Sequence, residues 1–132
     1  MKLTDLAILD WVLINNTPHK IQAIDSIDAE ILADDELYYV GEDRHHSEDK
    51  IEGIPITPEI LEKNGFIKVN SQRYDYGYPD TDCYVKVNPK KNMIHVNGRN
   101  ANSNLYSHSF VHELQHALRL CGLNELAGNF KI

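Results

Sequence analysis

In the first half of this chain the apolar residues come in short runs, and turn-forming or acidic residues interrupt each run. Runs of four or five residues predict short β-strands, because an amphipathic helix repeats its apolar positions over ten residues or more. The strand candidates before residue 56 are 11–15, 20–24, 29–33 and 37–40. Short strands this close together predict an SH3-like, barrel-type subdomain over residues 1–56, with Trp11 in its core or rim.

The remainder, residues 57–132, combines strand candidates with two helix candidates, so the predicted fold class is α+β. Thr57 and Pro58 are typical of a helix start, and Gly65 can adopt the left-handed conformation that ends one. Further strand candidates follow at 66–70, 74–78, 83–87, 93–96 and 129–132. The sequence leaves open whether the two parts have separate cores or form one continuous domain.

Residues 41–53 are strongly polar and are predicted to form an exposed loop. This loop contains the adjacent histidines His45 and His46. Adjacent imidazoles without neighbouring ligands are usually solvated, so we do not expect a metal site there.

The 132 residues include 20 Asp and Glu and 13 Lys and Arg, for a formal charge of −7. Residues 1–66 hold 15 of the acids and 5 of the bases. This balance removes the basic face that usually binds phosphate, so nucleic acid and membrane surfaces are disfavoured and a protein partner is expected. An acidic decoy that mimics nucleic acid is a second alternative function, suggested by the acidity of the first half.

The two cysteines, Cys83 and Cys121, are too few for a disulfide framework. No secretory signal is evident, and no apolar run approaches the ~20 residues that span a bilayer. We therefore expect reduced thiols, a cytoplasmic location and no membrane span. The oligomeric state is not predicted.

The most regular segment is the helix candidate that begins near Ser107 and ends at Gly122. Its apolar residues follow a 3.6-residue repeat centred on Leu114, and Leu123 is placed for the contact that closes a Schellman cap. On such a helix His112 and His116 point away from the apolar stripe, towards solvent or towards a cleft. This direction suits both a plain amphipathic helix and the active-site helix of a peptidase.

His112, Glu113 and His116 form an HExxH sequence on this helix. Histidines four residues apart can bind one Zn²⁺ at about 2.0–2.1 Å, and the glutamate can act as general base on the metal-bound water. A minimal zinc-dependent metallopeptidase or hydrolase, with zinc as cofactor, is therefore the first alternative function.

A catalytic zinc ion normally needs a third protein ligand, and the extended HExxHxxGxxH motif is absent because Arg119 and Gly122 occupy its later positions. His108 is about 12 Å from His116 along a straight helix, which is too far. Glu125 is the downstream candidate ligand, and His95 is a remoter one. Cys121 lies on the apolar stripe, away from the two histidines, and is therefore excluded as a ligand. Only 16 residues follow His116, which leaves little chain to build a substrate cleft.

Three blocks carry a resemblance to a known family: KLTDL leading to Trp11-Val12, GIPITPEILEKNGF over 53–66, and VHELQHALRLCG over 111–122. The chain resembles short uncharacterised proteins of gut Bacteroidetes and of their prophages or mobile elements. The resemblance implies Gln at the position of Glu113 and Asn at that of His116 in relatives, hence a structural or partner-binding helix. We therefore favour a non-enzymatic binding or accessory module, encoded by a prophage or mobile element, with no catalytic, metal-binding or cofactor-binding residue assigned.

Overall fold

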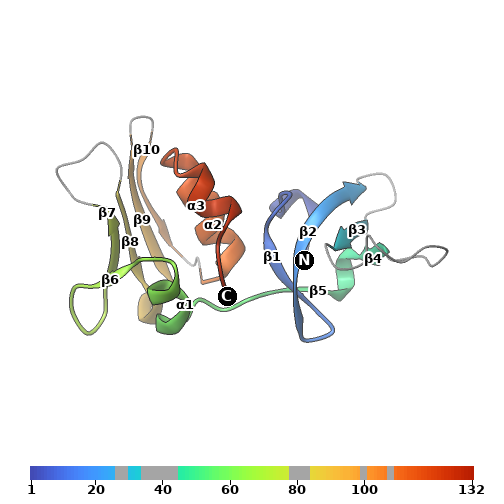
Figure 1. Ribbon diagram of the computed structural model, residues 1–132, viewed down its shortest axis with the longest axis horizontal. Helices are drawn as coiled ribbons and strands as arrows, with labels where there is room; N and C mark the ends of the chain where they lie inside the picture. The colour runs from blue at the N-terminus through green and yellow to red at the C-terminus, as the bar shows by residue number, and fades with distance from the viewer. Residues whose placement is uncertain (26–29, 34–44, 78–83, 99–100, 107–108) are drawn as a thin grey trace. The chain divides into compact units, whose positions relative to one another are not determined.

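The computed structural model describes residues 1–25, 30–33, 45–77, 84–98, 101–106 and 109–132 (Figure 1). The strand candidate 37–40 and the residues Cys83 and His108 lie outside these ranges. The contacts divide the chain into two compact units, Met1–Ile54 and Pro55–Ile132. Each unit contains one antiparallel sheet, so the predicted α+β class is confirmed. Within the described ranges, no helix is long and apolar enough to cross a membrane.

The first unit is a five-stranded antiparallel sheet with the order β4-β3-β2-β1-β5. Its elements are η1 (Leu3–Asp5), β1 (Trp11–Ile14), β2 (Thr17–Asp25), β3 (Glu30–Ala33), β4 (His45–Ser47), η3 (Glu48–Lys50) and β5 (Ile51–Gly53). The fifth strand returns to pair with the first, while β4 and β5 are the two edges. No closed barrel forms within the part of this unit that the structure describes.

Alternating burial along β1 shows why this segment is a strand. Val12 and Ile14 are buried, whereas Trp11 and Leu13 are partly exposed. Asn15 and Asn16 both have positive φ, as a two-residue type I′ hairpin requires, and this turn sets the pairing of Ile14 with Thr17. The core of the unit consists of Leu6, Val12, Ile14, Ile21, Ile31, Ala33 and Ile51.

The prediction of an exposed loop over 41–53 is wrong for residues 45–53. His45 and His46 belong to β4, and Ile51 is only 2% exposed in β5, where it pairs with Ile14. Short strands at a sheet edge accept polar side chains. Ile51 is the one buried isoleucine among charged residues in this segment, so the sequence shows no alternating apolar pattern from which β4 and β5 could be predicted.

The second unit is a meander of five antiparallel strands with the order β10-β9-β8-β7-β6. Its elements are α1 (Pro58–Lys63), β6 (Ile67–Lys68), β7 (Tyr74–Gly77), β8 (Tyr84–Asn88), η4 (Pro89–Lys91), β9 (Met93–Gly98), β10 (Ala101–Tyr106), α2 (Val111–Leu120) and α3 (Asn124–Gly128). The strand candidates at 66–70, 74–78, 83–87 and 93–96 are confirmed within a few residues. Strand β10 was not predicted, because its sequence ANSNLY lacks alternating apolar residues.

Helix α2 packs on one face of this sheet (Figure 1). The face includes Ile94 and Val96 of β9, both fully buried. Gly98 continues the same face, and a Cβ atom there would lie 3.1 Å from the Cα of Cys121 at the end of α2. Because side chains alternate along a strand, His95 lies on the opposite face, away from α2.

Both ends of α1 and the C-terminal end of α2 match the sequence prediction, whereas α2 begins at Val111 and not near Ser107. The Thr57 hydroxyl accepts a hydrogen bond from the Ile60 N–H, and Gly65 has φ +84°. At the end of α2, Gly122 has φ +81° and the Leu123 N–H donates to the Leu118 carbonyl at 2.9 Å, as in a Schellman motif.

The predicted strand over 129–132 is wrong. The chain instead forms the short helix α3 and then an irregular segment in which Phe130 is 1% exposed. Phe130 is buried and Lys131 is exposed, so the segment shows the alternation of a short strand without pairing as one.

Candidate functional site

Glu113 occupies the third position of α2 and caps the start of its own helix. Its Oε1 accepts hydrogen bonds from the backbone N–H groups of Phe110, at 3.1 Å, and Ser109, at 3.2 Å. This is the glutamate half of a capping box; the Phe110 side chain has no acceptor to supply the other half. The carboxylate is therefore bound to the backbone at the point where the helix begins.

His112 is only 4% exposed, so the expectation that it faces open solvent is wrong. Its ring stacks on that of Phe110, with centroids 5.9 Å apart and planes 12° apart. The His116 ring meets it edge-on at 5.8 Å, and His116 is itself partly buried. Helical periodicity places both histidines opposite Leu114. It does not predict the contact with the Phe110 ring, because Phe110 precedes the helix.

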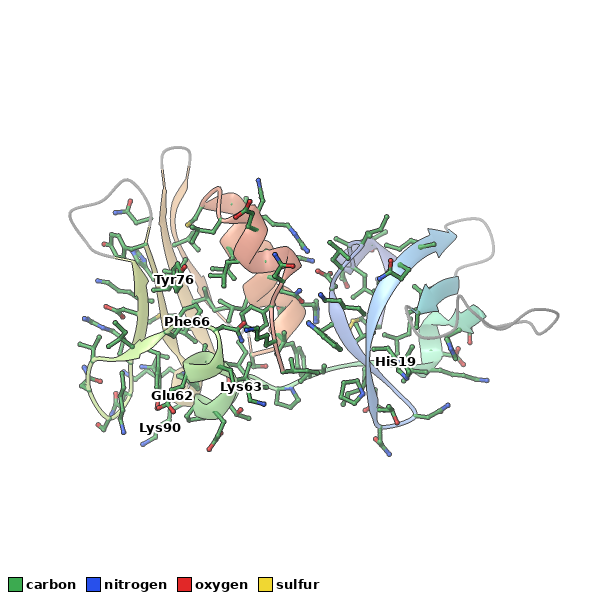
Figure 2. All side chains as sticks on the ribbon, viewed as in Figure 1. His19, Glu62, Lys63, Phe66, Tyr76 and Lys90 are labelled. Atoms are coloured by element: carbon green, nitrogen blue, oxygen red, sulfur yellow. The ribbon has the colours of Figure 1, made fainter. Side chains whose placement is uncertain are left out.

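The structure separates the other proposed zinc ligands from this pair. Glu125 is exposed on α3 and lines a hollow of about 700 Å³ together with Lys63 and Tyr76, both labelled in Figure 2. Neither His112 nor His116 lines that hollow. His95 lies on the sheet face opposite α2. Among the residues that the structure describes, no group of three His, Cys, Asp or Glu side chains could hold a metal ion.

Gln115, within the HExxH sequence, links α2 to α3. It is completely buried, and its Nε2 donates a hydrogen bond to the Ala127 carbonyl at 2.9 Å. A buried amide that satisfies a backbone carbonyl stabilises one arrangement of the two helices. Glu113 and Gln115 thus both bind backbone atoms.

A second candidate surface lies on the face of the sheet opposite α2, and the sequence analysis missed it. A hollow of about 330 Å³ on this face is lined by Arg73, Lys86, Val87, Asn88, Met93 and His95. The signal was present as a period-two pattern: buried Val85 and Val87 alternate with partly exposed Tyr84, Lys86 and Asn88. This pattern predicts a strand, but by itself it does not show that the exposed side chains line a hollow.

No family model, curated protein or solved structure matches this chain. The resemblance to proteins of gut Bacteroidetes therefore stays a prediction, and function has to be argued from the geometry of the two surfaces.

Proposed function

We propose that this protein is a non-enzymatic binding module, and that its HExxH helix is a structural element. The observation that carries the proposal is the pair of hydrogen bonds from the Ser109 and Phe110 N–H groups to Glu113. A general base must direct its carboxylate at the water it activates. A carboxylate that caps its own helix instead stabilises the fold.

The capping role also accounts for the variation that the family resemblance implies. A capping box accepts Gln as well as Glu at its third helical position, because the carboxamide oxygen accepts the same hydrogen bonds. A relative with Gln in place of Glu113 would keep the helix and lose only the general base. The stacked contact with Phe110 and the edge-on contact with His116 give the His112 ring a packing role too.

We further propose that the first unit has an SH3-like fold and binds a protein. Strands β1 to β4 form a meander, and β5 then pairs with the other edge of β1. The 3₁₀ turn η3 connects β4 to β5. SH3-like barrels have this connectivity. Residues 1–54 hold 13 acidic and 4 basic residues. A surface with this excess repels phosphate and attracts basic protein surfaces.

Two substitutions at Glu113 test the structural role. We expect Glu113→Ala to lower the free energy of unfolding by about 1 kcal/mol, because two backbone N–H groups lose their acceptor. Glu113→Gln should stay within about 0.5 kcal/mol of the wild type. Equal losses in both variants would contradict capping through this oxygen.

Zinc content tests the absence of an enzyme site. Protein purified without an affinity tag should contain no stoichiometric zinc by elemental analysis, and added Zn²⁺ should leave its melting temperature unchanged. Stoichiometric zinc that disappears in His116→Ala would overturn the proposed function. His19→Ala, in β2 of the other unit, is the matched control.

A further inference from the structure

The sheet face opposite α2 carries side chains from the central strands β8 and β9. On β8 they are Tyr84, Lys86 and Asn88, and on β9 they are Met93, His95 and Asn97, all of them partly exposed. The face therefore combines rings, amides and cations on a rigid hydrogen-bonded sheet.

The strand register brings these side chains into rows across the sheet. Lys86 pairs with Asp75 of β7 on one side and with His95 on the other, and Tyr84 pairs with Asn97. On β10, Asn102 and Asn104 occupy the register positions opposite Asn97 and His95. Cross-strand neighbours lie about 5 Å apart, so the side chains of one row can contact successive groups of an extended ligand.

The charge of this face is positive. Asp75 is the one carboxylate at the outward positions of β7, β8 and β9 that the structure describes, and Arg73 forms an ion pair with it at 3.0 Å. Lys86 lies with its Nζ 5.2 Å from the centre of the Tyr84 ring. Arg73, Lys86 and His95 together line the hollow, and none of the described residues in its wall is acidic. An anionic group fits such a wall.

We propose that this face binds single-stranded nucleic acid. Lys86 and Arg73 would contact phosphates, the Tyr84 and His95 rings would stack on bases, and Asn88 and Asn97 would hydrogen-bond base edges. Rings, cations and amides on an open surface are the groups that single strands require, because their bases are exposed. An acidic peptide would use the cations but leave the rings and amides without a role. This inference deepens the proposed binding function and rests on it.

The overall charge of −7 does not oppose this assignment, because it belongs to the other unit. Residues 55–132 contain nine Lys and Arg against seven Asp and Glu. The electrostatic argument that disfavoured nucleic acid thus applies to the first unit and not to this face. We expect modest affinity, with a Kd of about 10⁻⁵ M at low salt, because only a few phosphates are contacted.

Fluorescence anisotropy with labelled twelve-nucleotide oligo(dT) and oligo(rU) tests the proposal on the full chain. Lys86→Glu should weaken binding at least tenfold. The matched control is Lys131→Glu, which makes the same charge change at an exposed lysine beside α1, and it should change Kd less than threefold. Lys86→Gln should weaken binding to an intermediate extent, and Tyr84→Leu severalfold. Each variant is first compared with the wild type by its melting temperature.

Four results would overturn the proposal. They are no binding at 20 mM salt, equal losses in Lys86→Glu and Lys131→Glu, equal affinity for a twelve-base-pair duplex, and equal affinity for a poly-glutamate peptide. The last result would identify an acidic protein segment as the ligand. Zinc content and the Glu113 variants are measured on the same preparations, so failure of this inference is distinguishable from failure of the proposed function.

Discussion

The Asn64 side chain hydrogen-bonds both backbone polar groups of Lys131. Its Nδ2 donates to the Lys131 carbonyl at 2.7 Å, and its Oδ1 accepts from the Lys131 N–H at 2.8 Å. The same Nδ2 also donates to the Ile60 carbonyl at 2.8 Å. One buried amide at the end of α1 therefore gives the final segment the pairing that a neighbouring strand would otherwise supply, which explains why residues 129–132 need not join the sheet.

We expect Asn64→Ala to lower the free energy of unfolding by about 2–3 kcal/mol, since each hydrogen bond contributes about 1 kcal/mol and its partners stay buried. Asn64→Asp should cost at least as much, because a carboxylate cannot donate to the two carbonyls. The measurement is urea unfolding. Asn70→Ala is the matched control: its Oδ1 accepts from the Gln72 N–H at an exposed site, and the loss should stay below about 0.5 kcal/mol. Equal losses at the two sites would contradict this role of Asn64.

Features set by neighbouring residues were predictable from the sequence, and features set by distant ones were not. Thr57 begins α1, and Gly65 and Gly122 follow the ends of α1 and α2. Their hydrogen bonds reach only a few residues along the chain, so their roles were visible in the sequence pattern. The bond from Asn64 to Lys131 spans 67 residues and leaves no local pattern.

The candidate site divides in the same way. The apolar repeat centred on Leu114 predicted a helix, which is present, and the spacing of His112 and His116 on it suggested a possible zinc pair. The bonds from Ser109 and Phe110 to Glu113 are local, and a capping box could have been considered from Glu113 at the third position. The sequence had no signal for the stacking of the Phe110 ring on His112, because Phe110 precedes the helix and lies outside its periodic pattern.

Two glycines should resist substitution for different reasons. Gly122→Ala should cost about 1–2 kcal/mol through its positive φ, because a Cβ there meets nothing within 4 Å. Gly98→Ala should cost about 1–3 kcal/mol because its Cβ would press on the backbone of Cys121. Asn tolerates the left-handed conformation, so Gly122→Asn should recover part of the loss, whereas Gly98→Ser should not. Thermal unfolding measures all four variants, and the reverse pattern would refute both explanations.

Ser47 should control the ionisation of Asp49. The Ser47 hydroxyl donates a hydrogen bond to the Asp49 carboxylate, which lowers the pKa of Asp49 below its usual value. Ser47→Ala should raise that pKa, and carboxyl-carbon NMR during a pH titration measures it. Lys50→Gln is the control: Lys50 also lowers the pKa of Asp49 but less than Ser47 does, so its removal should raise the pKa by less. A larger rise in Lys50→Gln would contradict the assigned cause.

Gln115→Glu should make the stability of the second unit depend on pH. The introduced carboxyl group can donate to the Ala127 carbonyl only when it is protonated, and burial also favours that form, so its pKa rises on folding. A raised folded pKa means that the variant is most stable, relative to the wild type, below about pH 4.3 and loses stability as pH increases. Gln115→Leu is the control, because it removes the same hydrogen bond without a titrating group and should lose a constant amount. Urea unfolding between pH 4 and pH 7 measures both, and a constant difference between the two variants would show that the Gln115 site is open to water.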